Sequence, residues 1–246
     1  MQRIAIKRAT TVLTVLLAIA IGWWICSPRQ GPGFPASKRM MCANNMKWIG
    51  LALRQYEIDH GTFPPAFIPG DDEQPSHSWR VLLLPYLNQQ DLYDRYRFDE
   101  PWDGPNNSKL AAMMPDVFRC PACIGETPPT HTNYVACLHN DSVLSGSVPN
   151  ARSSIDDPIR GTLLISETRT HAVHWMSPFD LPSTEMYAEI ADGMGIHDRG
   201  FNAVMADGAA LFLPRTITPS DFESLVTRSG NEEPVELHSH PSPSTQ

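Results

Sequence analysis

Apolar positions first mark a membrane segment near the start of the chain. Residues 10–27 read TTVLTVLLAIAIGWWICS and contain no charge and no proline. A helix of this length rises about 27 Å, close to the ~30 Å hydrocarbon core of a bilayer. Tryptophans near its far end suit the membrane interface, and basic residues precede it: Arg3, Lys7 and Arg8. The positive-inside rule therefore predicts a transmembrane anchor, with residues 1–9 cytoplasmic and the rest outside the cytoplasm.

A cleaved signal peptide is the alternative for the same segment. Such a peptide ends in a small-x-small cleavage site, but the apolar run here continues as WWICSPRQ. A lipoprotein site would need a small residue before Cys26, where Ile25 stands. We therefore favour an anchor that stays attached.

A second apolar pattern, with helical spacing, follows a Gly/Pro-containing linker at residues 28–37. Apolar residues recur every three or four positions, which predicts a helix with one apolar face. They are Met46, Ile49, Leu53 and Tyr56. We expect this helix to run from about Lys38 to Asp59, because Gly61 and then two prolines follow.

The second half of the chain is typical of strands. Phe201–Ala206 and Ala209–Leu213 flank Asp207-Gly208, and this pattern predicts a tight hairpin. Further expected elements are helical Gln89–Tyr96, strands at Thr162–Ser166 and Ala172–Trp175, a short helix at Thr218–Thr227, and a helix or strand at Trp79–Leu87. The prediction is an α+β fold in which one long helix packs on a small antiparallel sheet with long loops. This domain would span residues 38–229, and the polar residues 230–246 would form a disordered tail.

Composition agrees with an ordered domain and excludes one class of partner. The chain has 23 prolines, roughly twice the average share, so short elements and long loops are expected. Beyond residue 30 it carries 15 basic and 27 acidic residues, a net charge of −12. Such a segment offers no cationic groove for phosphate, so we expect no nucleic-acid partner.

Several blocks, taken in order, resemble a bacterial family called domain of unknown function 1559. They are CANNMKWIGLALRQYEIDHGTFPP (Cys42–Pro65), HSWRVLLLPYLNQQDLYDRYRFDEPWDGPNN (His77–Asn107), FRCPAC (Phe118–Cys123), GTLLISE (Gly161–Glu167), HWMSPFDL (His174–Leu181), and a C-terminal signature of His197, nine residues, then Asp207-Gly208. The resemblance implies a pilin-like or pseudopilin-like domain in the bacterial envelope, anchored in the inner membrane. Family members typically begin with a Gly-Phe-Thr-Leu-x-Glu processing motif, which this sequence lacks. We therefore expect a fixed, membrane-tethered copy of the domain.

Four cysteines of the exported part are disulfide candidates: Cys42, Cys120, Cys123 and Cys137. An even number outside the cytoplasm favours disulfides. We expect Cys42 to pair with Cys120 or Cys123, because closing a long loop restricts the unfolded chain most. Free thiols and redox chemistry at the Cys-Pro-Ala-Cys motif are alternatives. Another alternative is a zinc site built from Cys120, Cys123, His131, Cys137 and His139.

The signature residues His197 and Asp207 are the other candidates for chemistry. Asp198 and Glu167 could join them in a hydrolase or metal site. However, five strand residues span roughly 16 Å, so the hairpin alone cannot bring His197 to Asp207. We expect an architectural role, with Asp207 and Gly208 forming a turn, and we predict no catalytic residue, no bound metal and no cofactor.

These observations predict a non-enzymatic, pilin-like envelope protein that acts in assembly, adhesion or secretion. Its expected partners are the lipid bilayer and other envelope proteins. An extracytoplasmic solute-binding or sensor domain is the alternative, and it requires a deep apolar pocket. A metal-dependent enzyme around His197 is the third hypothesis.

Overall fold

The longest element is a helix that begins close to its predicted position. The computed structural model describes residues 35–230, and in it helix α2 runs from Pro35 to His60. It begins three residues before Lys38, so the end of the predicted linker is helical. Gly61, with φ of 75°, follows the last turn and donates its N–H to the Glu57 carbonyl. The predicted cytoplasmic segment, the anchor, residues 28–34 of the linker and the tail from residue 231 lie outside the described residues.

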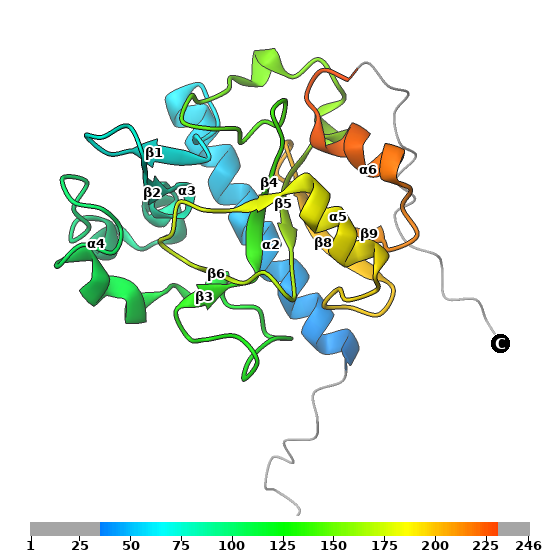
Figure 1. Ribbon diagram of the computed structural model, residues 1–246, viewed down its shortest axis with the longest axis horizontal. Coiled ribbons are helices and arrows are strands. Elements are labelled where there is room, and N and C mark those ends of the chain that lie inside the picture. Colours follow the sequence, from blue (N-terminus) through cyan, green and yellow to red (C-terminus); the bar gives the residue numbers. More distant parts are fainter. Residues whose placement is uncertain (1–34, 231–246) are drawn as a thin grey trace, which may run out of the picture. The chain divides into compact units, whose positions relative to one another are not determined.

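A five-stranded sheet forms the centre of the domain (Figure 1). Its order is β7-β4-β5-β8-β9, and all neighbours are antiparallel except the parallel pair β4 and β7. The strands are β4 (Tyr134–Leu138), β5 (Leu163–Glu167), β7 (Leu181–Pro182), β8 (Gly200–Met205) and β9 (Ala210–Pro214). The predicted hairpin is confirmed as β8 and β9, and the strand predicted at 162–166 is confirmed as β5.

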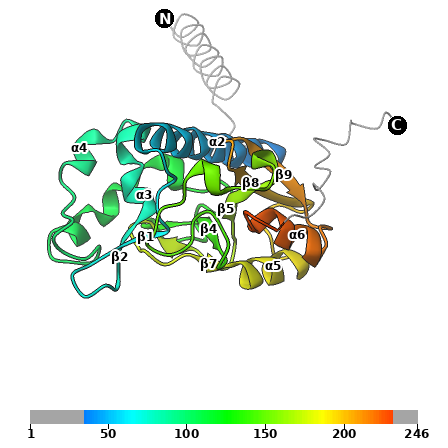
Figure 2. The ribbon, with the colours of Figure 1, turned by 90° about the horizontal axis from the view of Figure 1, so that it is seen from above.

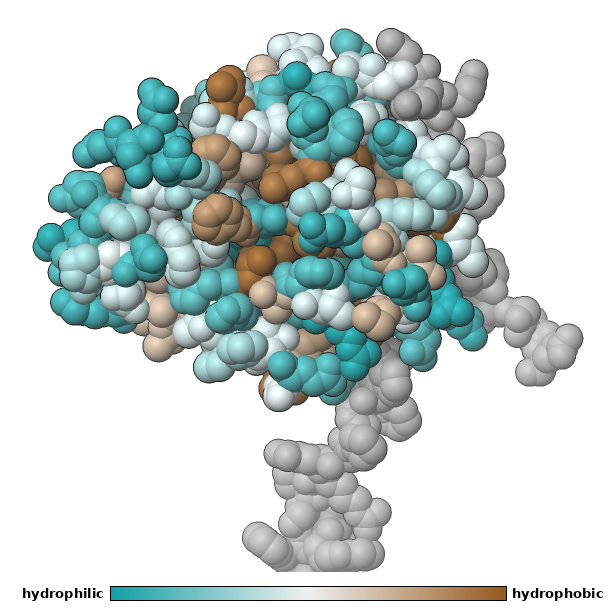
Figure 3. All heavy atoms as spheres, viewed as in Figure 1, coloured by the Kyte–Doolittle hydropathy of each residue, from teal (hydrophilic) through white to brown (hydrophobic). Residues whose placement is uncertain are grey.

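Helices cover both faces of this sheet (Figure 2). Along β4, Tyr134 and Ala136 join the core beneath α2, whereas Val135 and Cys137 join the opposite core. That second core contains α5 (Ser183–Ala191) and α6 (Pro219–Val226). The face carrying α5 and α6 is mainly polar, and its apolar side chains gather toward the middle (Figure 3). The α+β class is therefore confirmed, with one helix layer more than predicted.

Short elements and long loops make up the rest of the domain. The segment predicted as a helix or a strand at 79–87 is helical: α3 (Trp79–Leu82) is followed by a 3₁₀ turn (Leu84–Leu87). The predicted helix at 89–96 is reduced to α4 (Gln90–Tyr93). Two ribbons complete the described strands: β1 (Phe67–Pro69) with β2 (Pro75–Ser78), and β3 (His131–Thr132) with β6 (Val173–His174). Further 3₁₀ turns are Asn107–Met113, Asp116–Phe118, Arg152–Ser154 and Ile159–Gly161.

A fully buried ion pair joins α3 to the sheet. The Arg80 guanidinium donates to Asp180 Oδ1 at 2.5 Å, and both side chains are completely buried. The same carboxylate accepts hydrogen bonds from the Trp79 indole at 2.9 Å and the Ala136 backbone N–H at 2.8 Å. Arg80 also donates to the Tyr134 carbonyl at 2.9 Å. Every charged atom of the pair therefore has a polar partner, as burial of charge requires.

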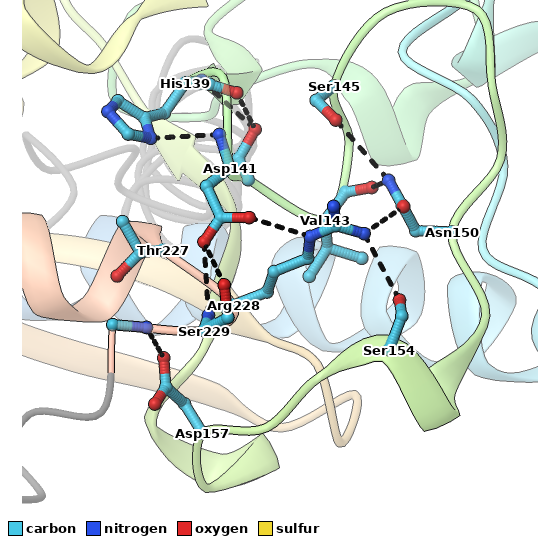
Figure 4. Close-up of polar contacts among 12 residues, drawn as sticks. His139, Asp141, Val143, Ser145, Asn150, Ser154, Asp157, Thr227, Arg228 and Ser229 are labelled. Carbon is cyan, nitrogen blue, oxygen red and sulfur yellow. Dashed lines mark hydrogen bonds and ion pairs between the residues drawn. The ribbon is translucent and has the colours of Figure 1, made fainter.

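A polar network holds the chain after α6 against the loop after β4 (Figure 4). Arg228 Nε donates to Asp141 Oδ1 at 2.9 Å, and the Ser229 hydroxyl donates to Asp141 Oδ2 at 2.6 Å. The same guanidinium reaches Asn150 and, at 3.3 Å, Ser154. These contacts fix the C-terminal end of the domain over the edge of its core.

Candidate functional site

Three side chains that can bind metals or transfer protons meet beneath α2. Cys42 lies on the buried face of α2, Glu167 ends β5, and His197 precedes β8. One sulfur, one carboxylate oxygen and one ring nitrogen lie within 4.8 Å of one another. His197 Nε2 is 3.3 Å from Glu167 Oε1, an ion-pair contact without hydrogen-bond geometry. Packing of α2 on the sheet thus assembles a site from three distant segments.

The orientation of Glu167 is fixed by the neighbouring strand. The Asn202 backbone N–H donates to Glu167 Oε1 at 2.7 Å, and the Asn202 side-chain amide donates to both carboxylate oxygens at 3.2 and 3.1 Å. Both residues are buried. Because Asn202 is on β8, the adjacent strand, the carboxylate is held toward His197 rather than free to rotate.

Two further thiols extend this cluster. Cys120 Sγ lies 3.3 Å from Cys42 Sγ, longer than the covalent S–S bond of about 2.05 Å. No disulfide is present among residues 35–230, where the four cysteines are buried free thiols. Cys123 packs in the same core, but Cys137 belongs to the core on the other face of the sheet. The predicted partners Cys42 and Cys120 are therefore neighbours, and a disulfide between them stays a prediction.

Burial and the neighbouring groups shift the pKa values of the cluster. Cys120 and burial raise the pKa of the Cys42 thiol, and Cys123 together with burial raises the pKa of Cys120 to about 12. Burial alone would lower the pKa of His197, but the adjacent Cys42 and Glu167 raise it to about 9. These shifts favour the neutral form of both thiols and the protonated form of His197.

A buried hydroxyl adds an unsatisfied group to the cluster. The Tyr134 side chain is completely buried, and its hydroxyl lies near the Asn45 side chain without a hydrogen bond of standard geometry. Burial raises its pKa well above the usual value, with smaller contributions from Cys120, Cys42 and Glu167. A buried hydroxyl without a well-formed hydrogen bond costs roughly 1–3 kcal/mol, so an acceptor beside Tyr134 would stabilise the structure.

The other signature residues serve the β8–β9 turn and its contact with α2. Asp207 accepts a hydrogen bond from the Ala209 N–H at 2.9 Å and pairs with Arg160 at 3.3 Å. Gly208 has φ of 86° and packs against Gly50 of α2. His197 and Asp207 lie before and after β8, which confirms that the hairpin keeps them apart.

The zinc set considered from sequence is not assembled. His131 packs edge-on against His174, with ring centroids 5.5 Å apart, and Cys137 faces the opposite core. Within residues 35–230, the cluster of Cys42, Glu167 and His197 is the one group of three or more such side chains close enough to share an ion. Asp198 is exposed and outside it. Sequence reasoning named each of the three residues but did not bring Cys42 to His197, because no local spacing connects them.

A hollow in the surface lies beside the thiols. It is lined by the loop from Arg119 to His131 together with Asn133, and both Cys120 and Cys123 contribute to its wall. It is partly open to solvent and formed largely by loop residues. The hollow thus reaches Cys120 and Cys123, and Cys42, Glu167 and His197 are not part of its lining.

The outer face of α2 carries a second candidate site, an apolar surface. Positions separated alternately by three and four residues are all exposed: Met41, Asn44, Trp48, Leu51, Gln55 and Ile58. Four of the six are large and apolar, with exposed fractions of 55% for Met41, 56% for Trp48, 47% for Leu51 and 62% for Ile58. We call these six residues the exposed seam. Their spacing is that of positions a and d in a coiled coil, a pattern that lets one helix pack along another.

Comparison with known proteins gives one match. Residues 35–154 match the family model described as "Protein of unknown function (DUF1559)". Searches of curated proteins and of solved structures found no match. Among residues 35–230, no helix has the length and apolar character needed to cross a membrane. The segment 35–154, slightly less than half of the chain, is therefore similar to the family of unknown function DUF1559.

Proposed function

We propose that the protein is a non-enzymatic, pilin-like structural protein of the bacterial envelope, tethered to the inner membrane and assembled through helix α2. The arrangement of one long N-terminal helix on an antiparallel sheet supports this proposal. The apolar, uncharged segment 10–27, with basic residues before it, supports the tether. The domain then lies outside the cytoplasm.

The exposed seam is the observation that carries the assembly role. The inner face of α2 is already buried on the sheet, so the seam adds nothing to the core of this domain. No other element of the described chain covers it in Figure 2. Leaving such side chains in water forgoes the stabilisation of about 25 cal/mol per Å² that burial gives, so four large apolar side chains along one helix face favour an interaction surface.

The seam fits a second copy of this chain in an antiparallel arrangement. Read in either direction, it runs apolar, polar, apolar, apolar, polar, apolar. Antiparallel pairing therefore places like against like: Met41 opposite Ile58, Asn44 opposite Gln55, and Trp48 opposite Leu51. The two amide side chains can hydrogen-bond each other in this register. A twofold axis along the membrane normal would direct both predicted anchors to the same bilayer.

The solute-binding alternative receives no comparable support. It requires a deep apolar pocket in which a few polar groups converge. The hollow beside Cys120 is instead open and is lined by a surface loop rich in polar residues and proline.

Photocrosslinking of the full chain in its membrane tests the proposal. A benzophenone amino acid replaces Trp48 in one variant and the fully exposed Asp116 in a control variant. We expect an adduct of twice the chain mass from Trp48 alone, with the crosslink mapping beside Leu51 of the second copy. Crosslinks to lipid or to residues 1–34 of the same chain, or no adduct above the control, would contradict assembly through the seam. Recovery of the mature chain in the soluble fraction without its first thirty residues would contradict the tether.

A further inference from the structure

We infer that the cluster beneath α2 is a zinc site with Cys42, Cys120, Glu167 and His197 as its four ligands. This inference is independent of assembly through the seam and concerns how α2 is fixed to the sheet. Thiolate, imidazole and carboxylate are the protein ligands that zinc takes in tetrahedral sites. Two sulfurs together with a nitrogen favour zinc over magnesium or calcium, which prefer oxygen ligands.

Three of the four ligand atoms are placed for one ion, and Cys120 must move closer to Glu167 or His197 to complete the set. Ligand atoms of Cys42, Glu167 and His197 already lie within 4.8 Å of one another, and Cys120 Sγ is 3.3 Å from Cys42 Sγ. With Zn–S bonds of about 2.3 Å, two sulfurs of a tetrahedral site are roughly 3.8 Å apart. The thiols therefore need to separate by only about half an ångström.

The surroundings supply what a metal site needs beyond its ligands. The Asn202 amide and backbone N–H orient the Glu167 carboxylate, as outer-shell partners of metal ligands do. The buried Tyr134 hydroxyl has no hydrogen bond of standard geometry, and it lies near Asn45 and near enough to Cys42, Cys120 and Glu167 to interact with each. A thiolate bound to the ion gives this hydroxyl an acceptor.

The protons and charges balance in the binding reaction. Zn²⁺ binds as each of the two thiols loses a proton to solvent, and any proton on the imidazole leaves as well. The ion is then held by two thiolates, one carboxylate and a neutral imidazole. No oxidant or reductant takes part.

A Cys42–Cys120 disulfide, one of the two pairings predicted for Cys42, and this zinc site exclude each other, because both use the same two sulfurs. A disulfide would leave the Tyr134 hydroxyl without the thiolate acceptor that the ion provides. It would also leave Glu167 and His197 as an ion pair without a shared ligand. Tyr134, Glu167 and His197 all lie near the two thiols, and this arrangement favours a zinc site over a disulfide.

Cobalt substitution in the purified full chain tests the site. The reduced, chelator-treated protein is titrated with Co²⁺ and then with Zn²⁺. We expect one equivalent of Co²⁺ to give a sulfur-to-cobalt charge-transfer band and strong visible bands of a tetrahedral site, and Zn²⁺ to remove both. Release of protons into a weakly buffered solution with a pH indicator should accompany uptake.

Matched variants separate the site from general effects of cysteine loss. Cys120→Ser should remove most of the charge-transfer intensity, and His197→Gln should weaken Co²⁺ binding at least tenfold. Cys137→Ser is the control, because it removes a buried thiol on the other face of the sheet and should leave the titration unchanged. If a variant does not fold, the Co²⁺ spectrum of the wild-type chain and its loss on addition of Zn²⁺ still test whether the site exists. A Co²⁺ spectrum without sulfur bands, equal loss in Cys137→Ser, or a Cys42–Cys120 disulfide in protein isolated from the envelope would overturn the inference.

Discussion

Replacing Asp180 with asparagine should destabilise the protein severely, because it leaves a buried charge without its partner. Asp180→Asn preserves the size of the side chain but removes its negative charge. Arg80 is completely buried, so its guanidinium cannot turn to water to recover the lost interaction. The asparagine amide would also point a donor group toward other donors, the Trp79 indole and the Ala136 N–H.

The expected loss is about 3–5 kcal/mol in the free energy of unfolding, the range for breaking a buried ion pair from one side. A domain of this size typically has 5–15 kcal/mol in total, so the variant would lie near the limit of folding. At about 2–4 °C for each kcal/mol, the midpoint of thermal unfolding should fall by roughly 6–20 °C. Asp116→Asn is the matched control, because Asp116 is fully exposed and its contact with Arg119 is 3.9 Å long.

Urea unfolding of the full chain, followed by tryptophan fluorescence, measures these differences. The double variant Arg80→Met with Asp180→Leu removes both charges and should be more stable than the sum of the two single changes predicts. The reasoning would be refuted if Asp180→Asn lowered the free energy of unfolding by less than about 1 kcal/mol, or by no more than the control does. The Arg80–Asp180 pair would then not be a strong interaction shielded from water.

Two further changes test the contact of α2 with the sheet and the anchoring of α5. Gly50→Ala should lower the free energy of unfolding in urea by about 1–3 kcal/mol, because the new methyl would overlap the Gly208 carbonyl. Gly161→Ala is the control and should leave the stability unchanged, because its methyl would meet no atom closer than 3.9 Å. Equal losses in the two variants would contradict this explanation. Burial acts to raise the pKa of Glu189, but hydrogen bonds from Thr168, Thr170 and Arg169 lower it below the usual 4.5. The stabilisation from this carboxylate is therefore complete above pH 4.5 and is lost as pH falls through the lowered pKa. Glu189→Gln should lower the free energy of unfolding by roughly 2 kcal/mol at pH 7. The stability of this variant should also fall less steeply in acid than that of the wild type. An unfolding midpoint with the same pH profile in both proteins would contradict this prediction.

Elements determined by local sequence were predictable, and elements determined by distant partners were not. Helix α2 follows from a three- and four-residue spacing, and the β8–β9 hairpin from a turn that needs positive φ at Gly208. Strand β4 was missed, although all but its last residue are buried. Strand β4 follows an irregular loop, and its antiparallel partner β5 begins 25 residues after β4 ends. The two strands are therefore not joined by a short turn whose sequence would predict their pairing.

The cluster beneath α2 shows the same limit for a site. Cys42, Glu167 and His197 were each identifiable as chemically capable, and the family resemblance marked His197. These three residues come together only because α2 packs close to β8. The spacing of apolar residues in the sequence does not predict that distance. The approach is set in part by Gly50 and Gly208, whose backbones lie so close that a methyl on either would crowd the carbonyl oxygen of the other.

This approach gives the His-x9-Asp-Gly spacing a physical meaning. His197 and Gly208 lie beyond opposite ends of β8, and each contacts α2: His197 near Cys42, and Gly208 at Gly50. Cys42 and Gly50 are eight residues apart on the helix, a rise of about 12 Å. The signature thus joins two contacts between one strand and one helix, the first polar and the second steric. Lengthening the segment between His197 and Gly208 by one residue would preserve at most one of these contacts, because it would also reverse the faces of β8.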